Sequence, residues 1–393
     1  MLIVRTRNNP ADPPEKSVSV VKYLSSLQFT TNKVRTFTFL LRMFCISVQL
    51  VLFYLPHTTD TAGKKSTVFQ HPEGEPAVKF GCYEFTCIFK KDAILPPYKG
   101  STLRGTFGHA LKRVVCALKQ SSCEKCLLAG QCVYPSIFEI RPVSGEGNAR
   151  NRIAAAPHPY IIEPPDDPKT RYRATESLTF GLILLGRAND CLAYFIYAFD
   201  QIGEAGIGKK IDGHAGSFIL ERVTADGKTI YTKKDGKIDR LRPPDELTAP
   251  DCSSVTNDDM EIEVDLVTPL RVKYQNILHA DLPFHVLTRA MLRRASTLFA
   301  AHGGGEPPLD YRGLVSRAAH VEVSRNNIAW HEWRRYSNRQ EQDMLMGGMT
   351  GSVRYRGKLA EYLPLLNFCE KVHVGKATTF GLGKIRVRIM PNS

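Results

Sequence analysis

The sequence predicts an α+β protein built from two tandem ferredoxin-like (RRM-like, β-α-β-β-α-β) domains. Three observations support this fold class: strand and helix patterns recur in the same order in two halves, a Gly-x-Gly-Lys element recurs in each half, and 393 residues suit two domains. The expected organisation is an irregular N-terminal extension (1–76), a first domain (77–225) with a Cys-rich insertion (116–135), a polar, Pro-rich linker or loop (226–259), and a second domain (260–393).

The first half contains each element of this order. Alternating apolar residues predict strands, and apolar residues at helical spacing, such as Leu103, Phe107 and Leu111, predict a helix. Asp190 is expected to cap the second helix, because its carboxylate can accept a backbone N–H at a helix start. The expected elements are a strand over Val78–Ile94, a helix over Gly100–Leu118, strands near Tyr160–Ile162 and Leu178–Leu185, a helix over 191–206 and a strand over Gly216–Val223.

The second half repeats the order. The expected elements are a strand over Glu261–Tyr274, a helix over Leu282–Ala300, strands over Ala329–Tyr336 and Met349–Tyr355, a helix over Tyr362–Val372 and a strand over Phe380–Ile389. In both halves Gly-x-Gly-Lys falls between the second helix and the last strand, at Gly206–Lys209 and Gly381–Lys384. Such a loop lets backbone amides approach a ligand, and its lysine adds a charge for phosphate. One copy is weak evidence, but two copies at one topological position are stronger.

The charge indicates a polyanionic partner. The net charge is +14 and the isoelectric point about 9.3. Nucleic acid is the commonest polyanion, an anionic membrane surface is the alternative, and basic residues that only solvate the surface are the simplest explanation. The segment Tyr98–Arg113 carries basic residues and no acid, and from Val321 onward twelve Lys/Arg stand against six Asp/Glu.

Four of the ten cysteines form one local cluster, C-x6-C-x2-C-x5-C, made of Cys116, Cys123, Cys126 and Cys132. Such spacing predicts a structural zinc site that stabilises the insertion. An iron–sulfur cluster would use the same four ligands. Free core cysteines without a metal are the alternative. The scattered remainder indicates a reduced, cytoplasmic protein.

The almost wholly apolar run Phe37–Leu55 does not fit this picture. Its length permits a membrane span or a late signal sequence, but Arg42 lies inside it and no small-residue cleavage site follows. An upstream extension of the reading frame with Met43 as a nearer start is the preferred explanation, an accessory helix is the second and an anchor is the third. We expect no membrane partner.

Five segments resemble the RAMP-superfamily endoribonucleases that process CRISPR precursor RNA, and the likeness extends from about Cys82 to Met390. The last of them is specific, because it ends in the glycine-rich loop typical of that superfamily's C-terminal domain. The segments are LPPYKGSTLRGTFGHALKRVVC (95–116), FGLILLGRANDCLAYFIYAFDQIGEAGIG (180–208), VTPLRVKYQ (267–275), RRYSNRQ (334–340) and LPLLNFCEKVHVGKATTFGLGKIRV (363–387).

This resemblance implies an endoribonuclease that binds a CRISPR repeat in precursor RNA and cuts once within it. In-line attack of a 2′-OH on the adjacent phosphorus gives a 2′,3′-cyclic phosphate and a 5′-OH, and this route needs no catalytic metal. The alternative is a non-cleaving RAMP subunit that binds and caps the guide RNA. A CRISPR effector complex is a further expected partner, and DNA is not. A third hypothesis, a membrane-tethered metalloprotein with no RNA role, leaves the duplicated architecture unexplained.

The resemblance implies a general-base histidine on or near the first helix, assisted by Tyr and Lys. His109 and Lys112 share one helix face, and Tyr98 precedes that helix. His109 could instead only pack against the sheet or complete the Cys site. His373, in the glycine-rich region, is the rival histidine.

RNA phosphates are expected to contact basic and glycine residues around the two predicted binding segments. Base stacking on Trp330, Trp333 and Tyr336 is a further hypothesis, although strand aromatics are more often core residues. The RNA-binding candidates are Lys99, Arg104, Lys376, Gly381, Gly383, Lys384 and Arg386, with Arg388 nearby.

Overall fold

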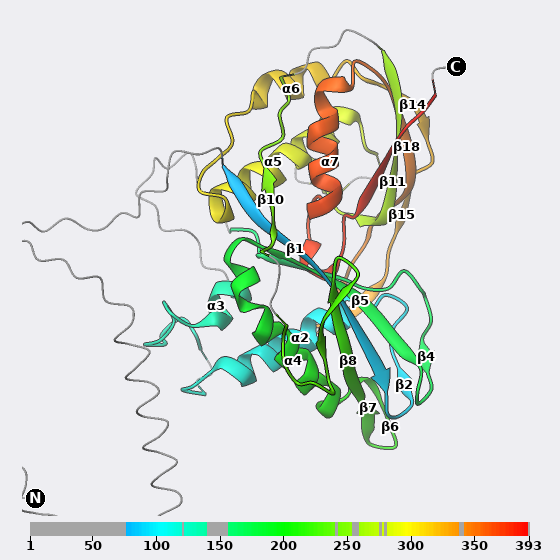
Figure 1. The fold of residues 1–393 in the computed structure, drawn as a ribbon. Coiled ribbons are helices and arrows are strands. Elements are labelled where there is room, and N and C mark those ends of the chain that lie inside the picture. Colours follow the sequence, from blue (N-terminus) through cyan, green and yellow to red (C-terminus); the bar gives the residue numbers. More distant parts are fainter. Residues whose placement is uncertain are drawn as a thin grey trace, which may run out of the picture. The chain divides into compact units, whose positions relative to one another are not determined.

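The structure is a computed structural model of the 393-residue chain (Figure 1). It describes residues 76–119, 122–139, 156–239, 243–253, 259–274, 277–278, 281–337 and 342–391. The chain divides into two compact units, Met1–Gln70 and His71–Ser393, and every described residue belongs to the second unit. The apolar run Phe37–Leu55 therefore lies outside the described residues, as does the rest of the predicted extension up to residue 75.

The first domain has the predicted ferredoxin-like topology. Its sheet runs β3-β5-β1-β8, so the four strands of the motif stand in the order second, third, first, fourth, and every pair is antiparallel. The helices α2 and α4 pack against each other through Phe107, whose ring stacks 4.8 Å from Phe195 and 5.4 Å from Phe199. The elements are β1 (Ala77–Phe89), α2 (Gly100–Val115), β3 (Tyr160–Glu163), β5 (Ser177–Leu185), α4 (Leu192–Ala205) and β8 (Phe218–Ala225).

The second domain repeats the same order. Its sheet runs β14-β18-β11-β19, again second, third, first, fourth, and again antiparallel. The fold class predicted from the sequence is thus confirmed for both halves. The elements are β11 (Met260–Leu270), α5 (Phe284–His302), β14 (Glu322–Asn326), β18 (Gly348–Gly357), α7 (Leu363–Val372) and β19 (Ile385–Ile389).

One predicted strand position was wrong in the second half. The second strand of the motif is β14, not Ala329–Tyr336, and all five of its residues are exposed. An exposed edge strand has no buried face to impose alternation, so the pattern gave no signal. The predicted segment instead forms β15 (Ala329–His331), which pairs with β18, and β16 (Arg334–Ser337), which pairs with β17 (Gln342–Leu345).

The predicted linker and the predicted helix cap also differ from the structure. Within 226–259, β9 (Lys228–Thr232) pairs with β8 and β10 (Asp245–Thr248) pairs with β1, so this segment extends the first sheet. Asp190 lies inside the 3-10 helix η1 (Gly186–Cys191) and caps nothing; α4 begins after Cys191 without a side-chain cap. Similarly, η3 (Thr378–Phe380) delays the last strand to Ile385.

Several short elements complete the described residues. A four-stranded sheet in the order β4-β2-β6-β7 lies in the first domain. The short elements are β2 (Ala93–Ile94), α3 (Val133–Ile137), β4 (Arg171–Tyr172), β6 (Ile207–Ile211), β7 (His214–Gly216), β12 (Lys273–Tyr274), β13 (Ile277–Leu278), α6 (Tyr311–Ala318) and η2 (Ala360–Tyr362).

The two domains share part of their buried apolar core. The core of the second domain includes Val78, Ile161 and Leu185, which come from the first domain, alongside Phe299 of α5. These shared contacts remove apolar surface of both domains from water, which favours one fixed arrangement of the pair.

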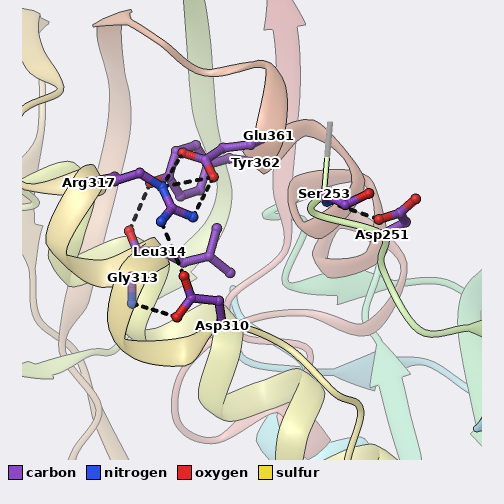
Figure 2. Close-up of polar contacts among 8 residues, drawn as sticks. All are labelled: Asp251, Ser253, Asp310, Gly313, Leu314, Arg317, Glu361 and Tyr362. Carbon is purple, nitrogen blue, oxygen red and sulfur yellow. Dashed lines mark hydrogen bonds and ion pairs between the residues drawn. The ribbon is translucent and has the colours of Figure 1, made fainter. Parts of the chain in front are cut away.

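Polar contacts at both ends of α6 hold this helix in place (Figure 2). Asp310 caps the helix by accepting the Gly313 N–H, and Arg317 donates to both carboxylate oxygens of Glu361. Tyr362 donates its hydroxyl to the Leu314 carbonyl at 2.8 Å. The helix is thereby tied to the segment where α7 begins.

Among the helices of the described ranges, none combines the length and apolar character that crossing a membrane requires.

Candidate functional site

A large groove of about 1860 Å³ lies between α2 and parts of the second domain. One wall is made by the segment before α2 and by the exposed face of that helix. The second domain contributes 267–269, His331, Trp333 and Phe380 to the lining. Both domains therefore contribute to a single site, as many ligand-binding clefts between domains do.

The predicted catalytic residues of the first domain meet in this groove. His109, Lys112 and Tyr98 all line it, with His109 exposed and Lys112 partly exposed. The ammonium of Lys112 lies 5.5 Å from the centre of the Tyr134 ring. An imidazole and an ammonium on one helix face give the groove a proton acceptor and a positive charge at close quarters.

Tyr98 is fixed across the seam between the domains. Its hydroxyl donates to the Phe380 carbonyl at 2.7 Å, and its ring centre lies 5.3 Å from that of Trp333. Burial, with smaller effects from Asp166 and Glu163, raises the pKa of the Tyr98 hydroxyl far above its ordinary value. Tyr98 therefore remains protonated and is occupied as a donor.

His331 is a groove residue that the sequence reasoning missed. The His331 side chain is exposed, and its ring lies 5.7 Å from Trp333, centre to centre, so His331, Trp333 and Tyr98 form a row of three neighbouring rings that runs from the second domain to the first. Period-2 alternation around β15 was a usable signal, because His331 and Trp333 share strand parity and both line the groove. Trp330 has the opposite parity and packs against the second domain's core. The Tyr336 side chain lies outside what the structure describes.

The other predicted contacts at α2 have internal partners. Lys99 is fully buried, and its ammonium donates to the Asp167 carbonyl at 2.6 Å and the Pro97 carbonyl at 3.2 Å. Burial lowers the pKa of Lys99. Arg104 does line the groove, with its guanidinium carbon 4.2 Å from the Phe138 ring centre and 5.0 Å from that of Phe380. The Lys99 side chain therefore stabilises the segment before α2. The Arg104 guanidinium contacts Phe138 of the first domain and Phe380 of the second.

His373 lies in a buried ion-pair network, away from the groove lining. Its ring is inaccessible; Nδ1 lies 3.1 Å from the Leu382 carbonyl, and Nε2 lies 2.9 Å from Oε1 of Glu163. The Lys384 ammonium lies 2.9 Å from the same carboxylate oxygen. Burial would raise the pKa of Glu163, but the hydrogen bonds and charges of His373 and Lys384 outweigh it and hold that pKa at about 2. The network links β3 of the first domain to the glycine-rich loop.

The glycines of that loop serve close packing. Gly381 and Gly383 have φ of 85° and 76°, and a Cβ on them would lie 2.6 Å from the Ile162 carbonyl oxygen and 1.8 Å from that of Val374. Their N–H groups donate to the carbonyls of Thr378 and Pro269, respectively. The predicted role of presenting free amides to a ligand therefore does not hold for these two positions in this structure. Arg386 and Lys376 are both exposed.

The four clustered cysteines lie at the end of α2 and within the insertion that follows it. All are partly exposed, and Cys123 lines the groove. The Cys126 N–H donates to the Cys123 carbonyl at 3.3 Å, and burial, followed by Glu139, raises the pKa of the Cys123 thiol. Nowhere in the described part of the chain do three or more His, Cys, Asp or Glu side chains form a group that could hold a metal ion. In the described conformation these residues do not fit a tetrahedral site.

Known proteins resemble the chain over both domains. Residues 78–245 match the family model AF_1859_N, described as an N-terminal domain, and residues 264–385 match the model described as CRISPR-associated endoribonuclease Cas6. An uncharacterized protein of Archaeoglobus fulgidus is 26% identical over 303 residues, which cover 75% of this chain and 93% of that protein.

Solved structures of similar chains include Cas6 from Thermus thermophilus, with 14% identity, a TM-score of 0.43 and coverage of 79% of this chain and 99% of that chain. A chain of a partial Cas6-RT-Cas1–Cas2 complex has 14% identity and a TM-score of 0.49; the match covers 81% of this chain but only 47% of that one. The match of the second domain to the Cas6 endoribonuclease model, together with the two ferredoxin-like domains, confirms the resemblance read from the sequence to the CRISPR-associated, RAMP-fold endoribonucleases that process repeat RNA.

Proposed function

We propose that this protein cleaves CRISPR precursor RNA within the repeat by metal-independent transesterification in the groove between its domains. The observation that carries the proposal is that His109, Lys112 and Tyr98 of the first domain line one groove together with His331, Trp333 and Phe380 of the second domain. A strand of RNA in that groove would meet both ionisable groups and aromatic stacking surfaces.

The reaction balances without a further reactant. A base takes the proton of the 2′-OH, the 2′ oxygen forms a bond to the adjacent phosphorus, and the bond from phosphorus to the 5′ oxygen breaks. An acid protonates that departing oxygen. The products are a 2′,3′-cyclic phosphate and a 5′-OH end.

His109 acts as the base in this proposal, because it is exposed in the groove and an imidazole can exchange protons near neutral pH. Lys112 stabilises the charge that develops on the phosphorane oxygens. Tyr98 acts as a positioning residue, since its hydroxyl is engaged with Phe380 and its ring supports Trp333. We assign protonation of the departing oxygen to His331, because the rival His373 is buried with both ring nitrogens engaged.

A cleavage assay in EDTA with repeat-containing RNA tests the mechanism. We expect one cut per repeat and a 2′,3′-cyclic phosphate on the upstream fragment, identified by mass spectrometry. A 5′-bridging phosphorothiolate at the cut site separates the histidines: its good leaving group needs no acid, so it should restore His331→Ala but not His109→Ala. Activity that disappears in EDTA and returns with a divalent ion contradicts the mechanism.

A non-cleaving RAMP subunit that caps the guide RNA is the second candidate function. The groove, the charge and the fold support it equally. Tight binding of repeat RNA with no product, in wild type and in the phosphorothiolate assay alike, would establish it, and association with an effector complex would then be tested by co-purification.

The cysteine spacing supports one further proposal, that the insertion binds a structural zinc ion or iron–sulfur cluster. It takes no part in the reaction above. Binding would require Cys116, Cys123, Cys126 and Cys132 to move together from the described conformation. Elemental analysis of purified protein decides it: we expect one metal site per chain, lost in Cys123→Ser/Cys126→Ser, and a metal-free wild type would refute it.

A further inference from the structure

Three arginines line a second cleft, which lies between α5 and α6 and shares no lining residue with the groove. Its volume is about 490 Å³. Arg289, Arg293 and Arg312 are all exposed and surround a floor made by Leu292 and Val315, among others. A concave surface with several guanidinium groups and an apolar floor suits a ligand that has both phosphates and flat bases.

One acid also lines this cleft. Glu306 accepts the hydroxyl hydrogen of Ser296 at 2.6 Å, so a neutral donor holds its carboxylate. Three guanidinium groups against this single carboxylate leave the lining with an excess of positive charge.

The fold keeps the arginines together. Arg289 and Arg293 are four residues apart on α5 and therefore lie on one helix face. Arg312 lies in the first turn of α6, which is anchored by the Asp310 cap and by the Arg317–Glu361 contacts shown in Figure 2. Arg289 and Arg293 of α5 and Arg312 of α6 thus line the cleft from its two helices.

The helix α5 reaches the glycine-rich region next to Arg293: the adjacent Arg294 donates to the Val372 carbonyl at 2.8 Å, and the Lys376 N–H donates to the Arg271 carbonyl at 2.9 Å. Burial lowers the pKa of Lys376, and the charges of Lys273, Arg293 and Arg271 lower it further. These four cations therefore lie within electrostatic range of one another. Like charges gathered in this way favour binding of a polyanion, because each phosphate contact relieves their mutual repulsion.

We propose that the α5–α6 cleft binds backbone phosphates of the precursor RNA outside the groove, along a track that runs from Lys376 over Arg293 to Arg289 and Arg312. The inference rests on the RNA binding of the proposed function and not on cleavage. A chain of regularly spaced phosphates is the ligand that can contact the cleft and the Lys376 cluster at once.

A filter-binding titration across salt concentrations tests this. The substrates are a long RNA, with the repeat and its flanks, and a short RNA limited to the nucleotides around the cut. We expect Arg289→Ala/Arg293→Ala/Arg312→Ala to weaken binding of the long RNA on the order of tenfold and to lower the slope of log K against log salt by about 2, since single-stranded RNA contributes about 0.7 per phosphate contact. Binding of the short RNA and its single-turnover rate at saturation should not change.

Two control variants make the test decisive. Lys228→Ala/Lys234→Ala/Lys237→Ala removes the same charge from exposed positions elsewhere and should leave binding within about twofold of wild type. Arg289→Lys/Arg293→Lys/Arg312→Lys keeps the charge and should recover most of the affinity. An equal loss in the first control, an equal loss on the short RNA, or no recovery with lysine would each overturn the proposal. A wild type that binds but does not cut would contradict only the proposed function.

Discussion

Two histidine–lysine pairs, one in each domain, have opposite environments. His109 and Lys112 lie on the face of α2 that lines the groove, where solvent reaches both. His373 and Lys384 flank the glycine-rich loop, and both are bound to Glu163, with the histidine fully buried. The sequence predicts His109 with Lys112 as the catalytic pair and His373 as the rival histidine, because both histidines lie near basic residues in predicted binding segments.

The difference between them lies in burial and in one carboxylate. Glu163 at the end of β3 occupies the ring nitrogen and the ammonium that the second pair could offer to RNA, whereas His109 is exposed to the groove. A buried, hydrogen-bonded ion pair fixes structure, and an exposed imidazole remains accessible for proton transfer. The pairs are therefore expected to respond oppositely to mutation.

The largest expected effect is on catalysis. His109→Ala should lower the single-turnover cleavage rate about 10³-fold, the usual contribution of a general base, with little change in thermal stability. Cleavage of repeat RNA at saturating protein measures the rate, and His214→Ala, which removes an exposed histidine outside the groove, serves as the control. A rate within a few-fold of wild type would remove His109 from the mechanism.

The second pair should act on stability instead. Glu163→Gln leaves the buried His373 and Lys384 without their charged partner and should lower the free energy of unfolding by about 3 kcal/mol, measured by denaturant titration. The control Glu176→Gln breaks a surface pair, in which the Lys169 and Glu176 side chains are 39% and 37% exposed, and should leave the free energy of unfolding almost unchanged.

The pH dependence of that loss follows from the depressed pKa. Glu163 titrates near 2 in the folded protein, against an ordinary value of 4.5. Its stabilisation is complete above pH 4.5 and is lost as the pH falls toward 2, so the difference between wild type and Glu163→Gln should shrink over that window. A difference that stays constant through the window would show that the substitution disturbs packing rather than charge pairing.

A smaller effect, on the salt dependence of RNA binding, is expected for the lysines of the two Gly-x-Gly-Lys elements. Lys209 is exposed and lines the groove, whereas Lys384 is paired with Glu163. Lys209→Met should lower the salt slope of RNA binding by about 0.7 and leave stability unchanged. Lys384→Met should leave the slope unchanged and slightly reduce stability. Equal slopes for the two variants would mean that the Glu163 pair opens when RNA binds.

The smallest effect is expected at the contacts drawn in Figure 2. Arg317 is half exposed, so Arg317→Met should cost only about 0.5 kcal/mol of unfolding free energy despite its bidentate geometry. A double-mutant cycle with Glu361→Gln isolates the pair. A much larger coupling would show that α6 contributes to the stability of the whole second domain.

The sequence predicted the features that depend on local pattern. Both helices and most motif strands of each half alternate or repeat around a buried face, and Phe107 or Val264 at such positions has no exposed surface. The exposed strand β14 and the strands within 226–259 lacked that pattern, since edge pairing needs backbone geometry more than apolar residues.

The site was predictable on the first domain, where His109 and Lys112 share a helix face. The part of the site that the second domain contributes was not predictable. His373 is engaged by Glu163, which is 210 residues from it in the chain, and that contact has no local signal in the sequence. Only the arrangement of the two domains decides which histidine is occupied.

The groove walls come from different domains, with His109 on one side and His331 on the other. The separation of the two proposed proton-transfer groups is therefore set by how the domains pack, and not by either domain alone. Substitutions of seam residues outside the groove lining, such as Val78 or Phe299, should then change turnover through alignment while leaving affinity almost intact. The packing of the two domains thus gives a way to change the rate of the proposed cleavage without changing the surface that binds RNA.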